Sequence, residues 1–355
     1  MYVASHSRTH RLEITKCDKV KWRVHRKPFS QSHQSGSEEI GTEIRNFKPP
    51  DLDGYLELHN TAEANDPDFR KLTAEDVRRT VLDHPYHDTE GHFVAVESGK
   101  MVASGRGIYS PEHVKIRGPV GYFELYILPN YLGKDIEKKL FARIVDYLKN
   151  HGVEWITTRV DTRYKARVHL LGRLGFSKTS YQNHGMERSS SGIEEPGPPK
   201  GYRVRTARIP EEIETMVNVF NEAFATRDKY PPMTMERFTK SWIFDDAENH
   251  SGFLLAERES DDRVVGMVMT GIDHKYNEEH GVKRGGTYSL ATIPSERRKG
   301  LGMFLTLKSL KWIGDRGMDV AYVSVNVAST DALRIYQKAG YKTVQVYQGY
   351  QLRIG

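Results

Sequence analysis

An internal repeat constrains the fold of this 355-residue chain more than any other feature of its sequence. Pro129 and Pro294 lie 165 positions apart, and so do Gly175 and Gly340. At the same offset, without a gap, six further positions match: Gly121, Leu125, Lys134, Leu140, Gly152 and Val160 fall on Gly286, Leu290, Lys299, Leu305, Gly317 and Val325. The repeat predicts two copies of one fold in tandem. The length agrees, because a domain averages about 150 residues.

Two compositional breaks set the boundaries of the copies. Residues 1–40 end in a polar string at 30–37 and contain too few apolar residues to order themselves, so they predict a basic, disordered arm. Residues 190–200 combine Ser, Gly and Pro without a hydrophobic period, which is typical of a linker. We therefore expect a first copy at 41–189 and a second copy at 201–355.

The second copy shows the expected order of elements. Apolar alternation and helical spacing predict, in turn, a strand at 202–206, a helix at 211–225, a hairpin at 253–257 and 264–271, a strand at 287–293, a helix from 300, a strand at 320–327, a helix after 329 and a strand at 341–350. The predicted fold class is α/β (α+β mixed), with two like domains. Each has a mixed, mostly antiparallel twisted sheet flanked by helices.

Composition excludes several classes of protein. With 37% hydrophobic and 28% charged residues, the chain reads as an ordinary globular protein. No apolar run reaches 18 residues, so we expect no membrane span and no membrane partner. The start has no apolar core typical of a secretory signal, and the lone Cys17 cannot form an internal disulfide. Both observations favour a cytoplasmic protein.

The net charge of +6 is concentrated in the arm. Residues 1–40 carry eight Lys or Arg and four acids, so the remainder of the chain is nearly neutral. Binding of the arm to nucleic acid or to another acidic surface stays open as an alternative, although no aromatic-interleaved RNA motif accompanies it.

One segment of the second copy predicts a site for a diphosphate. Ile293–Gly302 leads from a strand into a helix, with glycines at 300 and 302 and the cations Arg297, Arg298 and Lys299 before them. Glycines let the backbone approach a bulky anion, and the free amides and dipole of a helix start attract negative charge. The segment lies 36 residues before a helix end of the form Tyr336-x-x-x-Gly340-Tyr341.

Together these motifs resemble the GNAT superfamily of acyl-CoA-dependent N-acyltransferases. Arg297–Gly302 matches the Arg/Gln-x-x-Gly-x-Gly/Ala loop of that family, and Ala332–Tyr341 matches its Ala-x-x-φ-Tyr-x-x-x-Gly-Phe/Tyr helix, where φ is apolar. The tandem layout, with the stronger motif in the second copy, resembles two-domain members of the mycothiol synthase type.

The resemblance implies a cosubstrate, a reaction and a set of site residues. Acetyl-CoA would be the cosubstrate, without a metal, and a primary amine of a small molecule would attack the thioester directly. The CoA pyrophosphate would contact the loop Arg297, Arg298, Lys299, Gly300, Leu301 and Gly302. The pantetheine amides would pair with Leu290, Ala291 and Thr292, and Tyr336 would act as general acid towards the leaving thiolate.

The general base and the acceptor are not specified by these motifs. Thr287, Tyr288, Ser289 and Ser324 occupy the strand positions where the family often has an acid, and Ser329 stands where it commonly has Asn. Glu257, Asp273 and His274 are candidate bases only because they lie at predicted strand ends. A non-catalytic CoA-binding or regulatory protein is therefore the alternative function.

The first copy has lost the same motifs. At the fixed offset, Arg297 becomes Leu132, Gly300 becomes Asp135, Gly302 becomes Glu137 and Tyr336 becomes Leu171. Two carboxylates would stand where two phosphates bind, and unit charges 4 Å apart repel by about 4 kcal/mol at an effective dielectric near 20. We therefore expect the first copy not to bind CoA in this way.

A metal site is a weaker hypothesis for the first copy. His84, His87 and His92 lie close in the sequence with Asp88 and Glu90 between them. Their spacing falls in a Pro-containing, irregular segment, so a solvated loop is the favoured interpretation and no metal is predicted.

Overall fold

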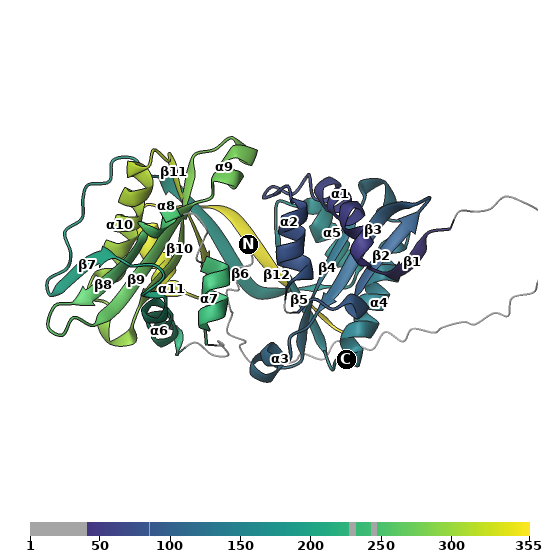
Figure 1. Ribbon diagram of the computed structural model, residues 1–355, viewed down its shortest axis with the longest axis horizontal. Helices are drawn as coiled ribbons and strands as arrows, with labels where there is room; N and C mark the ends of the chain where they lie inside the picture. Colours follow the sequence, from purple (N-terminus) through teal and green to yellow (C-terminus); the bar gives the residue numbers. More distant parts are fainter. Residues whose placement is uncertain (1–40, 85, 227–231, 243–246) are drawn as a thin grey trace, which may run out of the picture.

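The computed structural model describes residues 41–84, 86–226, 232–242 and 247–355 (Figure 1). The predicted arm at 1–40, with Cys17, lies outside the described residues. Figure 1 shows two lobes of mixed sheet and helix, joined by two long strands that run between them.

The first copy begins with five strands and the helices around them. In chain order they are β1 (Glu43–Asn46), α1 (Leu52–Ala62), α2 (Ala74–Val77), β2 (His92–Glu97), β3 (Lys100–Ile108), α3 (Pro111–Arg117), β4 (Val120–Ile127), α4 (Ile136–Asn150), β5 (Trp155–Asp161) and α5 (Lys165–Arg173). A π-helical turn at Arg78–Leu82 follows α2, and short 3-10 turns occupy Pro49–Asp51, Thr89–Gly91 and Pro129–Tyr131.

The remaining elements are the last strand of the first copy and then the second copy, which repeats this order. They are β6 (Ser177–Ser189), β7 (Tyr202–Thr206), α6 (Ile213–Phe224), α7 (Met235–Trp242), α8 (Ala247–His250), β8 (Phe253–Arg258), β9 (Val264–Ile272), α9 (His274–His280), β10 (Arg284–Thr292), the 3-10 turn Pro294–Glu296, α10 (Leu301–Asp315), β11 (Val320–Asn326), α11 (Thr330–Lys338) and β12 (Lys342–Arg353). The predicted elements of the second copy are all present within a few residues of their expected bounds. Helices α7, α8 and α9 were not expected from the hydrophobic pattern.

The twelve strands found in the described residues form one continuous sheet, in the order β1-β2-β3-β4-β5-β12-β6-β11-β10-β9-β8-β7. Most neighbours are antiparallel, and the parallel pairs are β4 with β5 and β10 with β11. The mixed, mostly antiparallel sheet flanked by helices agrees with the predicted fold class.

The last strand of each copy lies on the other copy's side of the sheet. β12 pairs with β5 along Tyr347–Arg353, whereas β6 pairs with β11 along Asn183–Ser189. We therefore use "first lobe" for β1–β5 with their helices plus β12, and "second lobe" for β7–β11 with their helices plus β6.

The hydrophobic cores follow the lobes. Tyr350 of β12 is buried in the core that β2–β5, α1, α4 and α5 form in the first lobe. Met186 of β6 is buried with Ile313, Val323 and Tyr336 in the second lobe. Each lobe thus completes its core with a strand from the other copy, so the two lobes are expected to depend on each other for stability.

The segment predicted to be a linker packs along α10 rather than standing apart from the lobes. Ile193 packs against the core of the second lobe, and Glu195 forms an ion pair with Lys308 of α10. A Cβ built on Gly300 would lie 3.5 Å from Pro199, so this segment also passes the start of α10.

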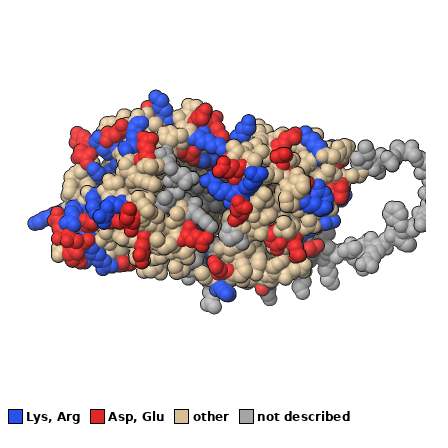
Figure 2. Space-filling model, viewed as in Figure 1, with Lys and Arg blue, Asp and Glu red and all other residues tan. Residues whose placement is uncertain are grey.

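Charged side chains of both signs are interspersed over the face that Figure 2 shows, in keeping with a nearly neutral body. In the part of the chain that the structure describes, no helix has both the length and the apolar character needed to cross a membrane.

Candidate active site

The start of α10 presents backbone amides without a side-chain cap. Gly300 is the N-cap residue and has a left-handed conformation, with φ of 90°. Because glycine has no side chain, no side-chain oxygen caps the first amides of the helix. Arg298, two residues earlier, is also left-handed at φ of 63°. The first amides of a helix have no partner within the helix, so this turn can accept an anion.

The two glycines of the loop serve different purposes. Gly300 permits the positive φ, which costs most residues about 1–2 kcal/mol. A Cβ on Gly302 would lie 2.8 Å from Cδ1 of Ile335, so Gly302 permits the close packing of α10 against α11. The sequence indicated an approach to phosphate at both positions, and the structure adds a packing role at the second.

The three cations of the loop have different surroundings. Arg297 donates to the carbonyls of Thr292 and Ala223, and Lys299 forms a 2.8 Å ion pair with the buried Glu296. Arg298 is exposed and makes no ion pair or hydrogen bond with the residues that the structure describes. Leu301 is 1% exposed and packs in the core, so only its backbone faces the loop.

Strands β10 and β11 separate just before this loop. They are parallel neighbours over four pairs, from Arg284–Val320 to Thr287–Val323. Beyond that point β10 pairs only with β9, and the register shifts between Thr287 and Ser289, which marks a bulge at Tyr288. A bulge bends its strand, so β10 and β11 leave a gap, hereafter the β10–β11 gap, that widens towards the loop.

The backbone of β10 presents alternate residues to the gap. The amide of Ile293 donates to Val265, the residue after the start of β9, at 3.0 Å. In an antiparallel ladder the hydrogen-bonding direction alternates along the strand, so Ala291 also faces β9 while Leu290 and Thr292 face away from it. Of the three strand residues expected to bind pantetheine, the structure brings Leu290 and Thr292 to the gap.

Tyr336 lies on α11, the helix that follows β11, and is buried in the core of the second lobe. It is 5% exposed, and its ring centre lies 5.7 Å from that of Tyr341. Burial, and to a lesser degree the neighbouring Tyr341, raise the pKa of Tyr336 well above its usual value. The phenol therefore keeps its proton at neutral pH, as a general acid requires.

The first copy has the same loop backbone, but one of its own carboxylates closes it. Gly133 and Asp135 are left-handed at φ of 85° and 64°, as are the equivalent Arg298 and Gly300. Glu137, which replaces Gly302, is 2% exposed, and its Oε1 accepts from the amide of Gly133 at 3.1 Å. Arg173 pairs with the same oxygen at 3.3 Å. The carboxylate thus occupies an amide that an anionic ligand would otherwise use.

An arginine fills the matching gap of the first copy. Strands β4 and β5 pair only at Val120–Gly121, so they separate as β10 and β11 do. Arg167 reaches into this gap, and its Nη1 donates to the carbonyl of Leu125, the equivalent of Leu290. At the position of Arg167 the second copy has Ala332, which has no polar side chain. Aligning the two copies at position 332 would have revealed this difference from the sequence.

The candidate bases named from the sequence are engaged elsewhere. Glu257 accepts from Arg203 and Arg205 at 2.6 and 2.7 Å, near the edge strand β7. Asp273 caps α9 through the amide of Tyr276. The His274 side chain is 58% exposed, 3.9 Å from Glu248. Neither Glu257 nor Asp273 forms a hydrogen bond or ion pair with a described residue that borders the β10–β11 gap, although the charge of Asp273, after burial, contributes to the raised pKa of Tyr288 at the bulge.

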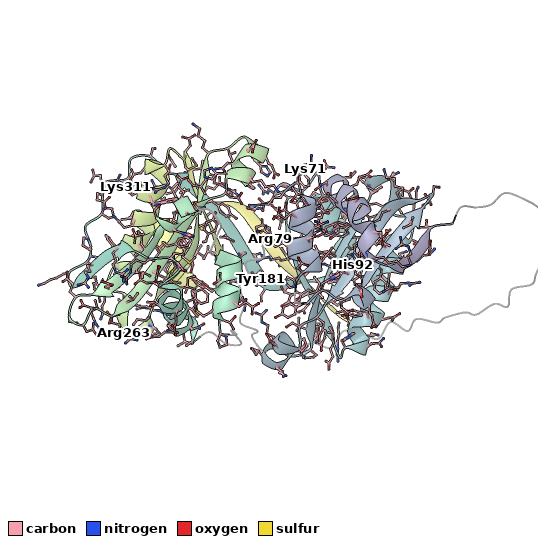
Figure 3. The ribbon with its side chains drawn as sticks, in the orientation of Figure 1. Lys71, Arg79, His92, Tyr181, Arg263 and Lys311 are labelled. Atoms are coloured by element: carbon pink, nitrogen blue, oxygen red, sulfur yellow. The ribbon has the colours of Figure 1, made fainter. Side chains whose placement is uncertain are left out.

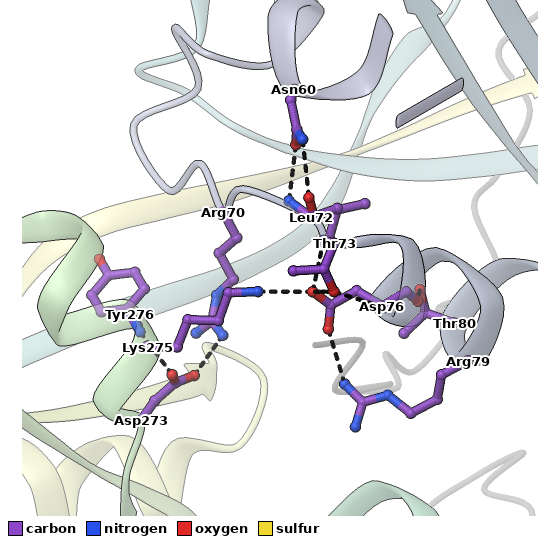
Figure 4. Close-up of polar contacts among 10 residues, drawn as sticks. All are labelled: Asn60, Arg70, Leu72, Thr73, Asp76, Arg79, Thr80, Asp273, Lys275 and Tyr276. Atoms are coloured by element: carbon purple, nitrogen blue, oxygen red, sulfur yellow. Dashed lines mark hydrogen bonds and ion pairs between the residues drawn. The ribbon is translucent and has the colours of Figure 1, made fainter. Parts of the chain in front are cut away.

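Asp273 instead joins the two lobes (Figure 4). Its Oδ2 lies 2.5 Å from Arg70 of the first lobe, and Lys275 of α9 lies 2.8 Å from Asp76 of α2. Burial alone would raise the pKa of Asp76, but hydrogen bonds from Lys275 and Thr73 outweigh it and lower the pKa to about 2. These pairs hold α9 against the segment between α1 and α2.

The histidines of the first lobe form a hydrogen-bonded chain rather than an open cluster. Nε2 of His87 lies 3.3 Å from Nδ1 of His92, and Nε2 of His92 lies 3.0 Å from Oγ of Ser104. His92 is fully buried inside the first lobe (Figure 3) and stacks on Phe47. No group of three or more potential metal ligands gathers within the described ranges.

Comparisons with known proteins agree with these observations. The model of the acetyltransferase (GNAT) family matches twice, at residues 57–176 and 213–341, which is more than half of the chain. A mycothiol acetyltransferase of Saccharomonospora viridis is 31% identical over 247 residues, covering 64% of this chain and 77% of its own length. One from Thermobispora bispora is 28% identical over 222 residues, covering 61% and 71%.

Solved structures show the same architecture. A tandem GNAT protein from the clavulanic acid biosynthesis pathway has a TM-score of 0.65 at 11% identity, covering 89% of this chain and 99% of its own. A GCN5-related N-acetyltransferase from Sphaerobacter thermophilus has a TM-score of 0.64 at 19% identity, covering 88% and 96%. The chain belongs to the acetyltransferase (GNAT) family, as a tandem acyl-CoA-dependent N-acetyltransferase that resembles mycothiol acetyltransferase.

Proposed function

We propose that this chain transfers an acetyl group from acetyl-CoA to a primary amine of a small molecule, and that the second copy performs the reaction. The observation that supports the choice of copy is the contrast at two equivalent places. Glu137 and Arg167 occupy the loop and the gap of the first copy, whereas Gly302 and Ala332 leave both places free in the second.

The residues of the second copy suit the three parts of acyl-CoA. The uncapped amides of α10 and the unpaired Arg298 would bind the pyrophosphate, and the outward-facing backbone of Leu290 and Thr292 would pair with the pantetheine arm. This arrangement directs the thioester towards the bulge at Tyr288. A backbone amide there would stabilise negative charge on the carbonyl oxygen as it develops.

In the proposed reaction Tyr336 is the general acid. The deprotonated amine attacks the thioester carbonyl carbon, a C–N bond forms and the C–S bond breaks. Tyr336 gives its proton to the departing thiolate, and the nitrogen loses a proton to solvent, from which the phenolate is reprotonated. The products are an N-acetylated amine and CoA.

Calorimetric titration with acetyl-CoA tests the choice of copy. One site per chain is expected, because the first copy has no free anion site in its loop. Two equivalent sites per chain would contradict the assignment.

Release of free thiol from acetyl-CoA tests the activity. The acceptors to be tried are amino sugars, aminoglycosides, polyamines, small thiol precursors and peptide N-termini. Glu257 and Asp273, two of the candidate bases, form ion pairs with arginines. A non-catalytic CoA-binding protein is therefore the alternative function. Tight binding of acetyl-CoA with no thiol release from any acceptor would favour the alternative.

Substitution of Tyr336 tests its role as acid. Tyr336→Phe should lower kcat by about 100-fold or more, since general acid catalysis typically contributes that much, while the affinity for CoA stays unchanged. Tyr341→Phe is the matched control, because Tyr341 is an equally buried neighbour. Equal kcat values for the two variants would show that Tyr336 is not the acid.

A further inference from the structure

Asn326, the last residue of β11, has a buried donor without a partner. The residue is 6% exposed, and its Nδ2 makes no hydrogen bond within the part of the chain that the structure describes. Its Oδ1 accepts from the amide of Ala328 at 2.8 Å, and this contact determines which side-chain atom is the oxygen. A buried donor without a partner loses its hydrogen bonds to water and gains none in return, which is unfavourable.

The first copy contains an internal control for this position. Asp161 is the equivalent residue, also buried, and its Oδ1 accepts from the amide of Arg163 at 2.8 Å in the same kind of turn. Its second oxygen, however, is fully used by Gln345 at 2.8 Å and by Arg163 at 2.7 Å. The second copy differs in two ways: Ala328, which has no polar side chain, stands at the position of Arg163, and Nδ2 of Asn326, a donor, stands where Asp161 has its second accepting oxygen.

The position of Asn326 in the sheet explains where a partner can come from. On one side β11 is paired with β6 as far as Asn326, opposite Asn183. On the other side its pairing with β10 ends at Val323. Asn326 therefore lies where β11 borders the β10–β11 gap, about level with Leu290 by continuation of the register.

We propose that Nδ2 of Asn326 donates a hydrogen bond to an amide carbonyl of the pantetheine arm of acyl-CoA, opposite Leu290. Asn326 is then a binding residue for the cosubstrate, and the ligand supplies the acceptor that Nδ2 lacks, whereas Asp161 obtains its donors, Gln345 and Arg163, from the protein itself. The inference rests on the proposed CoA site of the second copy.

The test compares the binding of CoA with the binding of a ligand that lacks pantetheine. Asn326→Asp keeps the shape and the oxygen that accepts from Ala328, but it replaces the donor with an oxygen that repels a carbonyl. Calorimetry should show CoA and acetyl-CoA binding about tenfold or more weakly. Adenosine 3′,5′-bisphosphate, which has no pantetheine, should bind as it does to the unchanged protein.

Asp161→Asn is the matched control in the first copy, and it should leave the affinity for CoA unchanged. Unchanged CoA affinity in Asn326→Asp would overturn the inference, as would equal weakening of CoA and adenosine 3′,5′-bisphosphate. A loss confined to acetyl-CoA would also overturn it, by placing the contact on the thioester. If the unchanged protein fails to bind CoA, the proposed function itself is wrong.

Discussion

At the scale of single residues, the two copies differ by a few side chains set on nearly the same backbone. The left-handed pair Gly133 and Asp135 repeats the pair Arg298 and Gly300, so the turn itself has been kept. Glu137 bonds the amide of Gly133, and Arg167 bonds the carbonyl of Leu125. The first copy thus satisfies internally the backbone groups that its counterpart leaves for a ligand.

Substitutions at the helix start test this contrast. Gly300→Asp should abolish CoA binding, because it adds a negative charge and an unfavourable positive φ at the same place. Asp135→Gly should not create a second site, because Glu137 and Arg167 remain in place. Calorimetric titration of both variants with CoA gives the stoichiometry, and a second site in Asp135→Gly would contradict the role of these two side chains.

The buried His92 should make the free energy of unfolding depend on pH. Burial lowers the pKa of His92 to about 3, against about 6.5 in an unfolded chain. Between these values the unfolded state binds more protons, so the free energy of unfolding should fall as the pH falls, by up to about 1.4 kcal/mol per pH unit.

Urea denaturation at pH 7 and pH 5 measures this effect. His92→Gln should reduce the difference in stability between the two pH values by about 2 kcal/mol, because the amide cannot be protonated in this range. His274→Gln, at a side chain that is 58% exposed, is the control and should keep the difference of the unchanged protein. Equal pH dependence in all three proteins would show that His92 is not the source.

At the scale of elements, the exchanged pair β6 and β12 decides how the two lobes are joined. Gly349 lies at a register shift of this pair, and a Cβ there would approach Oγ1 of Thr179 to 2.6 Å. Gly185 has a similar place, since its Cβ would lie 2.8 Å from the side chains of Gln345 and Tyr322. The two glycines therefore let β6 pack closely against the strands beside it.

A glycine substitution in β12 should destabilise both lobes together. Gly349→Ala forces a shift of β6 and should lower the free energy of unfolding by about 1–3 kcal/mol. Gly172→Ala is the control, because nothing lies within 4 Å of its Cβ in α5 and alanine favours a helix. Thermal unfolding followed by hydrogen exchange in each lobe checks this. A loss of protection confined to one lobe would contradict the shared role of the strand pair.

At the scale of the whole molecule, neither copy contains all the strands of one lobe. The family matches end at residues 176 and 341, just before β6 and β12 begin. The lobes also meet through Arg70 with Asp273 and Lys275 with Asp76. We therefore expect the complete chain, rather than a copy of it, to be the unit that folds.

Recombining the strands tests this expectation. A chain of residues 41–176 joined to 342–355 should be more stable than residues 41–189, because it has the strand that pairs with β5 and contributes Tyr350 to the core. Circular dichroism during thermal unfolding gives the comparison. If residues 41–189 are as stable as the recombined chain, the pairing of β12 with β5 is not required by the first lobe.

The repeat, the element order and the glycine turn at the start of α10 were all predictable from the sequence, because each depends on local patterns. Residue spacing determines which segments form helices and strands, and Gly300 with its preceding cations marks the helix start. The loss of the motif in the first copy is also evident from the sequence, because Asp135 and Glu137 stand at the positions of the two glycines.

Only the tertiary structure decided which lobe each final strand joins. It also decided which backbone groups Glu137 and Arg167 contact, and that the side-chain donor of Asn326 has no partner among the described residues. The last strands of the two copies offer similar backbone donors and acceptors, so local sequence cannot select between their partners. Hydrogen bonds between residues far apart in the chain, such as Gln345 with Asp161, exist only once the strands have paired.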